Sequence, residues 1–155
     1  MTDRFCPRVT AALRAGGWHP GRDVSAQLEP VLAELAAVTG AAGQRHQVFP
    51  AALAVLREFD SVVVAQDGPG AAVARRPFAI DPLLVAHTTA TLAAAGQALG
   101  VRLFPVGCEG LDAAVLAVDE TGRLLALDHA GEWLLGETFD QGVTALVTGA
   151  EPVPL

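Results

Sequence analysis

Residues 102–127, RLFPVGCEGLDAAVLAVDETGRLLAL, carry the pattern that decides the fold. We expect three short strands here, at 102–106, 113–118 and 123–127, because Val, Leu and Phe are concentrated in them. The segment 119–122, Asp-Glu-Thr-Gly, has the length and composition of a hairpin turn between the last two strands. Those two strands are apolar at nearly every position, so we expect both faces of the sheet to be covered.

Proline and glycine mark the helices around this stretch. Proline fits the first helical turn, where its missing N–H has no partner, and glycine commonly follows the last turn. These signals, the apolar spacing and a capping box at Thr138 and Gln141 predict five helices: 6–15, Pro30 to before Gly40, Pro50 to Phe59, Asp81 to Leu99, and Thr138 to before Gly149. Two further strands are expected at 61–65 and 72–80, on either side of a turn at 67–70.

The order of these elements predicts an α+β fold. We expect a single domain at 1–150, with a mostly antiparallel sheet of about five strands packed with helices, and a frayed tail at 151–155. The 155 residues are 52% hydrophobic and 17% charged, which provides enough apolar surface for a core and excludes a disordered chain.

The overall composition argues against several classes of partner. A formal net charge of -7, with ten Arg and no Lys, is opposite to the basic face that non-specific nucleic-acid binding requires. The N-terminus lacks the uninterrupted apolar segment of a signal peptide, and the uncharged residues 82–101 are too rich in Ala to favour membrane insertion. Two cysteines, Cys6 and Cys108, suit a reducing interior. We therefore expect a cytoplasmic protein with no nucleic-acid partner and no membrane partner.

Residues suited to catalysis are scattered along the chain. His19, His46, His87 and His129 are not paired at metal-ligand spacing, and neither cysteine belongs to a Cys-x-x-Cys motif. The glycine-rich turn 67–70 lacks the Lys and Ser/Thr of a phosphate-binding loop. We therefore predict no metal, no cofactor and no catalytic residue, while a small enzyme whose site is built from distant residues stays an alternative.

Acidic residues are unevenly distributed. Residues 1–77 contain eight Arg and seven acids, a net of +1, whereas residues 78–155 contain two Arg and ten acids, a net of -8. Such an excess is either a solvated face that keeps the protein soluble or a docking surface for a basic protein. The candidate contact residues are Glu109, Asp112, Asp119, Glu120, Asp128, Glu132 and Trp133.

The expected hairpin divides these candidates between two ends of the sheet. Asp119 and Glu120 lie at the turn, whereas Asp112 and Asp128 are expected near each other at the opposite end. A loop would have to join these acids into one surface. Trp133 lies in a glycine-flanked segment, which fits either an interface anchor or a core residue.

Several short motifs follow one another in the order seen in a known family. From the N-terminus they are 15–18 (AGGW), 20–22 (PGR), 49–52 (FPAA), 56–59 (LREF), 68–70 (GPG), 78–82 (FAIDP), 103–107 (LFPVG), 117–123 (AVDETGR) and 135–140 (LGETFD). In these motifs and their spacing, which cover nearly the whole chain, the sequence resembles the third subgroup of the SUKH superfamily. One motif departs from the family: Phe59-Asp60-Ser61-Val62 stands where a Phe-Gly-Gly-Leu turn is usual, which suggests a reshaped strand entry.

The resemblance implies a single α+β domain that acts as an immunity protein of bacterial polymorphic toxin systems. Its implied activity is binding: the domain blocks a cognate toxin, often a nuclease or a nucleic-acid deaminase, and needs no cofactor or catalytic residue. Because enzymes that act on nucleic acid are often basic, the acidic second half of this chain fits such a partner. The alternative is a SUKH-like domain that serves as a scaffold or regulatory binding protein in another operon.

Overall fold

Strands β4 (Ala114–Asp119) and β5 (Leu124–Asp128) form the predicted hairpin in the interior of the sheet. Val118 lies opposite Leu124 across the turn, and both strands are buried along their length except at Asp128. Because successive side chains of a strand point to opposite faces, burial at all the remaining positions means that both faces of the hairpin are covered, as the apolar sequence predicts.

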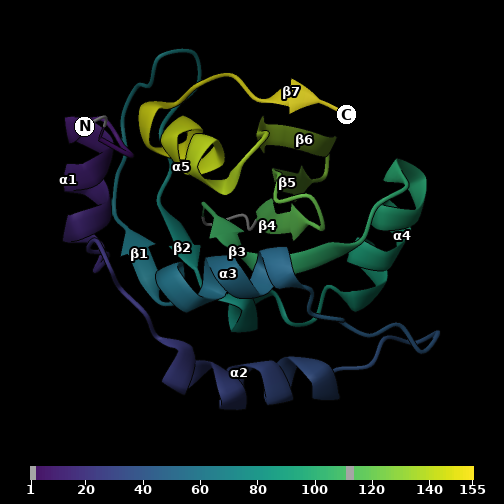
Figure 1. Cartoon of the computed structure of the whole chain (residues 1–155). Coiled ribbons are helices and arrows are strands. Elements are labelled where there is room, and N and C mark those ends of the chain that lie inside the picture. Colours follow the sequence, from purple (N-terminus) through teal and green to yellow (C-terminus); the bar gives the residue numbers. More distant parts are fainter. Residues whose placement is uncertain (1–2, 111–113) are drawn as a thin grey trace.

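The computed structural model describes residues 3–110 and 114–155. In this part of the chain, seven strands form one antiparallel sheet in which each strand pairs with its neighbours in sequence (Figure 1). The strands beside the hairpin are β1 (Val62–Val64), β2 (Phe78–Ile80), β3 (Leu103–Glu109), β6 (Gly131–Gly136) and β7 (Val153–Pro154). The predicted α+β class is confirmed, and the sheet has two strands more than the five expected.

The two additional strands lie at one edge of the sheet. β6 has the sequence GEWLLG, whose flanking glycines favoured a loop, yet it pairs with β5 so that Ala126 lies opposite Trp133. β7 lies in the tail that the sequence predicts to fray, and it pairs with β6 so that Leu134 lies opposite Val153. Pro154 is compatible with this position because an edge strand has one side without a neighbour, where a missing N–H is tolerated.

Each predicted helix is present in the structure. The helices are α1 (Pro7–Ala15), α2 (Ser25–Ala37), α3 (Pro50–Phe59), the 3-10 helix η1 (Pro82–Val85), α4 (Thr89–Leu99) and α5 (Phe139–Thr148). Thr138 caps α5 as predicted, because its Oγ1 accepts a hydrogen bond from the Gln141 N–H at 3.1 Å. α3 crosses in front of the sheet in Figure 1, and α2 packs outside α3.

Two helices differ from the predicted bounds. α2 begins at Ser25 rather than Pro30, and Asp23, just before the N-cap residue Val24, accepts a hydrogen bond from the Ser25 N–H at 2.9 Å. Pro30 therefore lies inside α2, where its missing N–H removes one helical hydrogen bond. The helix expected at 81–99 is interrupted, since η1 ends at Val85 and α4 begins at Thr89. Between them, the Thr88 hydroxyl donates a hydrogen bond to the Val85 carbonyl, a local bond that competes with helical pairing.

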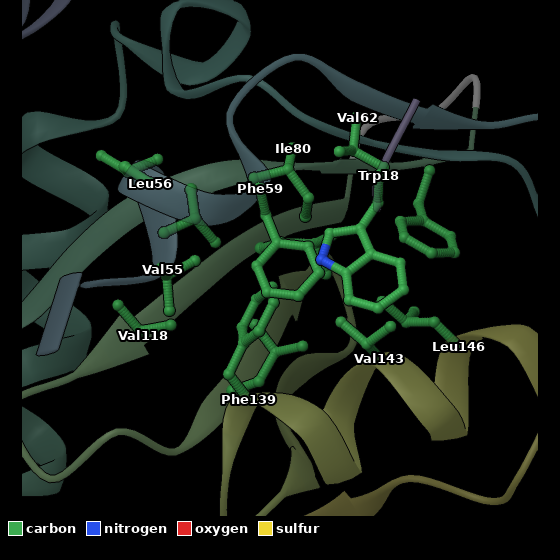
Figure 2. Packing of buried hydrophobic residues seen from close by; sticks show 14 of the residues in the cluster. Trp18, Val55, Leu56, Phe59, Val62, Ile80, Val118, Phe139, Val143 and Leu146 are labelled. Atoms are coloured by element: carbon green, nitrogen blue, oxygen red, sulfur yellow. The ribbon is translucent and has the colours of Figure 1, made fainter. Parts of the chain in front are cut away.

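The main core lies between the sheet and the helices α1, α3 and α5. Trp18 stacks on Phe59 with ring centroids 6.1 Å apart, and the Phe59 ring lies 4.8 Å from that of Phe139. Val143 and Leu146 of α5 close this cluster (Figure 2). A second cluster packs under α4 on the opposite face of the sheet and comprises Val85, Leu92, Ala95, Leu103, Val115, Ala117, Leu125 and Leu127. The predicted covering of both faces is therefore confirmed.

The turn before β1, where the sequence departs from the family motif, has an unusual backbone. Ser61 has a φ of 72°, in the left-handed region that glycine adopts without strain. Arg22 braces this turn, because its guanidinium donates hydrogen bonds to the carbonyl oxygens of Glu58 and Asp60. The turn thus holds, with a serine, a conformation that a glycine would adopt more easily.

Candidate partner-binding surface

The predicted contact residues divide into two groups at opposite ends of β4 and β5. Glu109 pairs with Ala114 at the start of β4, and Asp128 ends β5 on the same side of the sheet. Glu120 lies in the turn at the other end. Asp112 lies outside the described residues. We call the two regions the cavity end, with Glu109 and Asp128, and the hairpin end, with Glu120.

The carboxylate of Asp119 is part of the hairpin itself. Its side chain is 0% exposed, and Oδ1 accepts hydrogen bonds from the N–H groups of Thr121 and Arg123, each at 3.0 Å. Oδ1 also accepts a hydrogen bond from the Thr121 hydroxyl at 2.7 Å, and Oδ2 accepts a fourth from Arg123 Nε at 2.6 Å. Burial raises the pKa of Asp119, but the hydrogen bonds from Thr121 and Arg123 outweigh it and place this pKa below its ordinary value. Asp119 therefore stabilises the turn and offers no accessible atom to a partner, which corrects its sequence-based assignment to the contact surface.

Glu120 is exposed at the turn, but its charge is compensated. Arg102 Nε lies 2.7 Å from Glu120 Oε2, and the two side chains are 60% and 35% exposed. The hydrogen bond from Arg102 lowers the pKa of Glu120. Exposed pairs of this kind contribute little to stability, and this one leaves the hairpin end with little net charge.

A cavity of about 220 Å³ opens at the cavity end of the sheet. Small and apolar side chains of its lining, which we call its inner part, come from β4, β5, β6 and α5: Ala114, Ala126, Leu135, Ala145 and Leu146. The charged and aromatic side chains of the lining, which we call its rim, are Arg76, Glu109, Asp128 and Trp133. Three of the predicted contact residues therefore line the same hollow.

Asp128 and Trp133 hold each other in place at this rim. Asp128 Oδ1 accepts hydrogen bonds from Trp133 Nε1 at 3.1 Å, from the Ala130 N–H at 2.8 Å and from the Gly131 N–H at 3.2 Å. These bonds, first of all the one from Trp133, keep the pKa of Asp128 below its ordinary value. Trp133 is half-buried and packs against the main core on one side. Its core packing is one of the two roles that the sequence left open, and its exposed side leaves room for the other.

Glu109 is a half-buried carboxylate beside two other charged groups. Burial raises its pKa, the charge of Arg76 opposes this effect, and the charge of Asp128 adds to it. Within residues 3–110 and 114–155, Glu109 forms no ion pair. Its carboxylate is therefore available to a positive group that approaches the rim.

Glu132 lies beside the cavity but faces away from it. Neighbouring residues of a strand point to opposite faces, so Glu132 and Trp133 lie on opposite sides of β6. The Glu132 carbonyl accepts a hydrogen bond from the Leu155 N–H at 3.0 Å and thereby helps to hold β7. Its half-buried carboxylate forms no ion pair with the described residues, so it contributes an uncompensated charge to this end.

The segment before β2, which the sequence predicts as part of the strand, instead lies against the end of α5. The Ala71 N–H donates to the Thr148 carbonyl at 2.9 Å, and the Val73 N–H donates to the Gly149 carbonyl at 3.0 Å. Gly149 permits this approach, since a Cβ there would lie 2.5 Å from the Val73 carbonyl oxygen. Arg76, at the end of this segment, lies at the rim. The sequence analysis missed it because its position depends on pairing between distant segments, including the hydrogen bond from the Gly110 N–H to the Pro77 carbonyl.

Metal sites, membrane-spanning helices and disulfides each require features that the described residues lack. Among residues 3–110 and 114–155, no three His, Cys, Asp or Glu side chains are grouped so that they could hold a metal ion. None of the helices in the same ranges is long and apolar enough to cross a membrane. Both cysteines are free thiols.

Comparison with known proteins finds one family pattern over nearly the whole chain. The family model described as SUKH-3 immunity protein matches residues 5–149. No curated protein and no solved structure matches the chain. The matched range contains α1 to α5 and β1 to β6, and therefore both ends of the hairpin as described above.

Proposed function

Because the chain belongs to the SUKH-3 immunity protein family, we propose that it neutralises a cognate bacterial toxin by direct contact. Membership of this family implies toxin neutralisation and a toxin partner, and such immunity proteins are typically not enzymes. We further propose that the toxin is a basic protein that acts on nucleic acid, as a nuclease or a deaminase, and that the two proteins meet in the cytoplasm.

Uneven charge is the observation that supports a basic partner. Residues 78–155 carry a net charge of -8. The carboxylates of Glu109 and Asp128 line the cavity, and Glu132 lies at the same end of the sheet on its opposite face. A surface of one sign attracts a partner of the opposite sign and raises the rate of association. Proteins that act on nucleic acid present positive charge to phosphates, so an acidic inhibitor can cover the same surface that the toxin uses for its substrate.

We assign the contact surface to the cavity end. Its proposed contact residues are Glu109, Asp128, Glu132 and Trp133. The half-buried tryptophan supplies an aromatic anchor of the kind that often dominates binding energy in protein interfaces. Glu120 adds little attraction, since Arg102 compensates its charge.

The test takes the product of the gene adjacent to this one as the candidate toxin. Co-expression with the immunity protein should restore growth to cells that the toxin arrests, and the two proteins should co-purify. Glu132→Lys reverses a charge without breaking an ion pair of the described chain, and we expect it to slow association about tenfold at low salt. The matched control is Glu34→Lys, the same change at an exposed position of α2.

Other outcomes would count against the proposal. Equal association rates for the parent and Glu132→Lys, with no dependence on salt, would leave the acidic residues as a solvated face. Binding of the neighbouring gene product without rescue of growth would instead favour a scaffold or regulatory role.

A further inference from the structure

We propose that the cavity at the cavity end receives one arginine side chain of the toxin. This inference rests on the proposed function and adds the chemical identity of the group that enters the cavity. We call the site the cation pocket, and define it by Ala126, Leu135 and Leu146 inside and by Arg76, Glu109, Asp128 and Trp133 at the rim.

The size and lining of the cation pocket fit a single long side chain. Its volume of about 220 Å³ is below the roughly 300–1,000 Å³ typical of pockets for drug-sized ligands. The inner residues Ala126, Leu135 and Leu146 are apolar and suit a methylene stem. A long basic side chain can bury such a stem while its charged head stays at the rim.

The rim offers three groups to the head of an arginine. The Trp133 indole is held by its hydrogen bond to Asp128, and an aromatic ring in a fixed position attracts a cation over its face. The carboxylates of Asp128 and Glu109 can each accept charge-assisted hydrogen bonds. A planar guanidinium stacks on an aromatic ring and donates in several directions, whereas an ammonium is a compact, strongly hydrated charge. The rim therefore favours arginine over lysine.

The charges that face the cation pocket also favour a positive guest. The lining contains two carboxylates, Glu109 and Asp128, and one guanidinium, Arg76, which forms no ion pair with either acid in the described structure. His129 adjoins Asp128 and supports its ionised form. Burial of Glu109 disfavours its charge, so an incoming cation relieves an existing electrostatic cost. A negative guest would instead meet two carboxylates.

The test uses the free protein and a blocked arginine, N-acetyl-arginine amide. Binding is followed by the indole N–H signals of the two tryptophans in NMR spectra, assigned with Trp133→Phe. We expect the Trp133 signal to shift and saturate, while the signal of Trp18, which is 5% exposed, stays in place as an internal control. N-acetyl-citrulline amide has nearly the same shape without the charge and should bind at least about tenfold more weakly.

Two variants place the binding at the cation pocket. Glu109→Gln should weaken the binding of blocked arginine about tenfold, because it removes one rim carboxylate. Glu120→Gln removes the same charge at the hairpin end and should leave binding unchanged. A Trp133 signal that does not move, or that moves equally with arginine and citrulline, would overturn the proposal. Tighter binding of N-acetyl-lysine amide would overturn the choice of arginine.

The toxin then separates this inference from the function on which it rests. Saturable arginine binding by a chain that fails to neutralise the toxin would refute the proposed function and leave the cation pocket as a site. Neutralisation of a toxin whose affinity is the same for the parent and Glu109→Gln, together with no arginine binding, would refute the cation pocket and leave the function.

Discussion

Acids at the two ends of the β4–β5 hairpin have similar sequence surroundings and different environments in the folded chain. At the hairpin end, Asp119 is fully buried and hydrogen-bonded, and Glu120 is paired with Arg102. At the cavity end, burial raises the pKa of Glu109, which forms no ion pair with the residues described. Asp119 therefore helps to build the fold, whereas Glu109 holds charge that a partner can neutralise.

Local geometry explains this difference. In the short turn 119–122, the N–H groups of Thr121 and Arg123 lie close to the carboxylate of Asp119 and are free to donate to it. At the cavity end, a backbone donor beside Glu109 is already used, since the Gly110 N–H bonds to the Pro77 carbonyl at 2.8 Å. The comparison predicts that substitution of Asp119 mainly changes stability and that substitution of Glu109 mainly changes binding.

Asp119→Ala should have the largest effect of the substitutions that test this comparison. It removes the acceptor of hydrogen bonds from Thr121 and Arg123, and it leaves the Arg123 guanidinium without its partner. We expect the free energy of unfolding to fall by about 3 kcal/mol in urea titrations. The control is Glu120→Ala, the adjacent exposed acid. Equal urea midpoints for the two variants would show that Asp119 does not hold the turn.

Acid pH should expose the same contribution without a substitution. The folded pKa of Asp119 lies below its ordinary value of 3.8, so its stabilisation is complete above that pH and is lost as the pH falls through the folded value. Below about pH 4, the parent should therefore lose stability more steeply than Asp119→Ala. Parallel pH profiles of the two proteins in urea unfolding would contradict this assignment.

Gly149→Ala should have the next largest effect, because it tests how the wall of the cavity is built. Gly149 has a φ of 71°, and a Cβ there would meet the Val73 carbonyl oxygen at 2.5 Å. We expect a loss of about 2 kcal/mol. Gly100→Ala is the matched control, since Gly100 has the same φ of 71° with nothing within 4 Å of its Cβ, and should lose about 1 kcal/mol. Equal losses would show that the wall adjusts without cost.

The contrast between local and distant contacts also explains what could be predicted from the sequence. The turn 119–122 and the cap at Thr138 depend on residues close in the chain, so their residue types were sufficient to predict them. The contact between Gly149 and Val73 joins distant segments, and no local pattern encodes it. The cavity wall depends on this contact, and Arg76 is positioned by the pairing of β2 with β3, so neither was predicted.

Charge in the sequence likewise predicted an acidic region but not its division. Asp119 and Glu120 are neighbours, yet one is buried and the other exposed, because the turn directs one carboxylate inward. Glu132 and Trp133 are also neighbours, and the alternation of β6 places them on opposite faces. This second division could have been predicted if the glycine-flanked segment had been recognised as a strand.

Glu109→Gln should raise stability slightly, an effect opposite in sign to the losses expected for Asp119→Ala and Gly149→Ala. The folded pKa of Glu109 is raised above its ordinary value of 4.5, so between these two values the folded chain binds more protons than the unfolded chain. Stability therefore falls as the pH rises through this window, and glutamine removes the loss. At pH 7 we expect a gain of less than about 1 kcal/mol in urea unfolding, with no gain below about pH 4. A variant less stable than the parent at pH 7 would refute this sign.

Glu120→Gln should have the smallest effect, and it asks whether the two ends act separately on a partner. It changes the net charge by the same amount as Glu132→Gln, but at the other end of β4, whose six residues span about 20 Å. The Debye length, beyond which charges are largely screened from each other, is about 8 Å at physiological salt and about 30 Å at 0.01 M. In stopped-flow experiments with the toxin at physiological salt, Glu132→Gln should therefore slow association about twofold while Glu120→Gln leaves the rate unchanged. At 0.01 M salt the association rates of the two variants should converge, because the attraction between charges then reaches over the whole length of the strand. Equal slowing at both salt concentrations would mean that the toxin contacts both ends of the sheet.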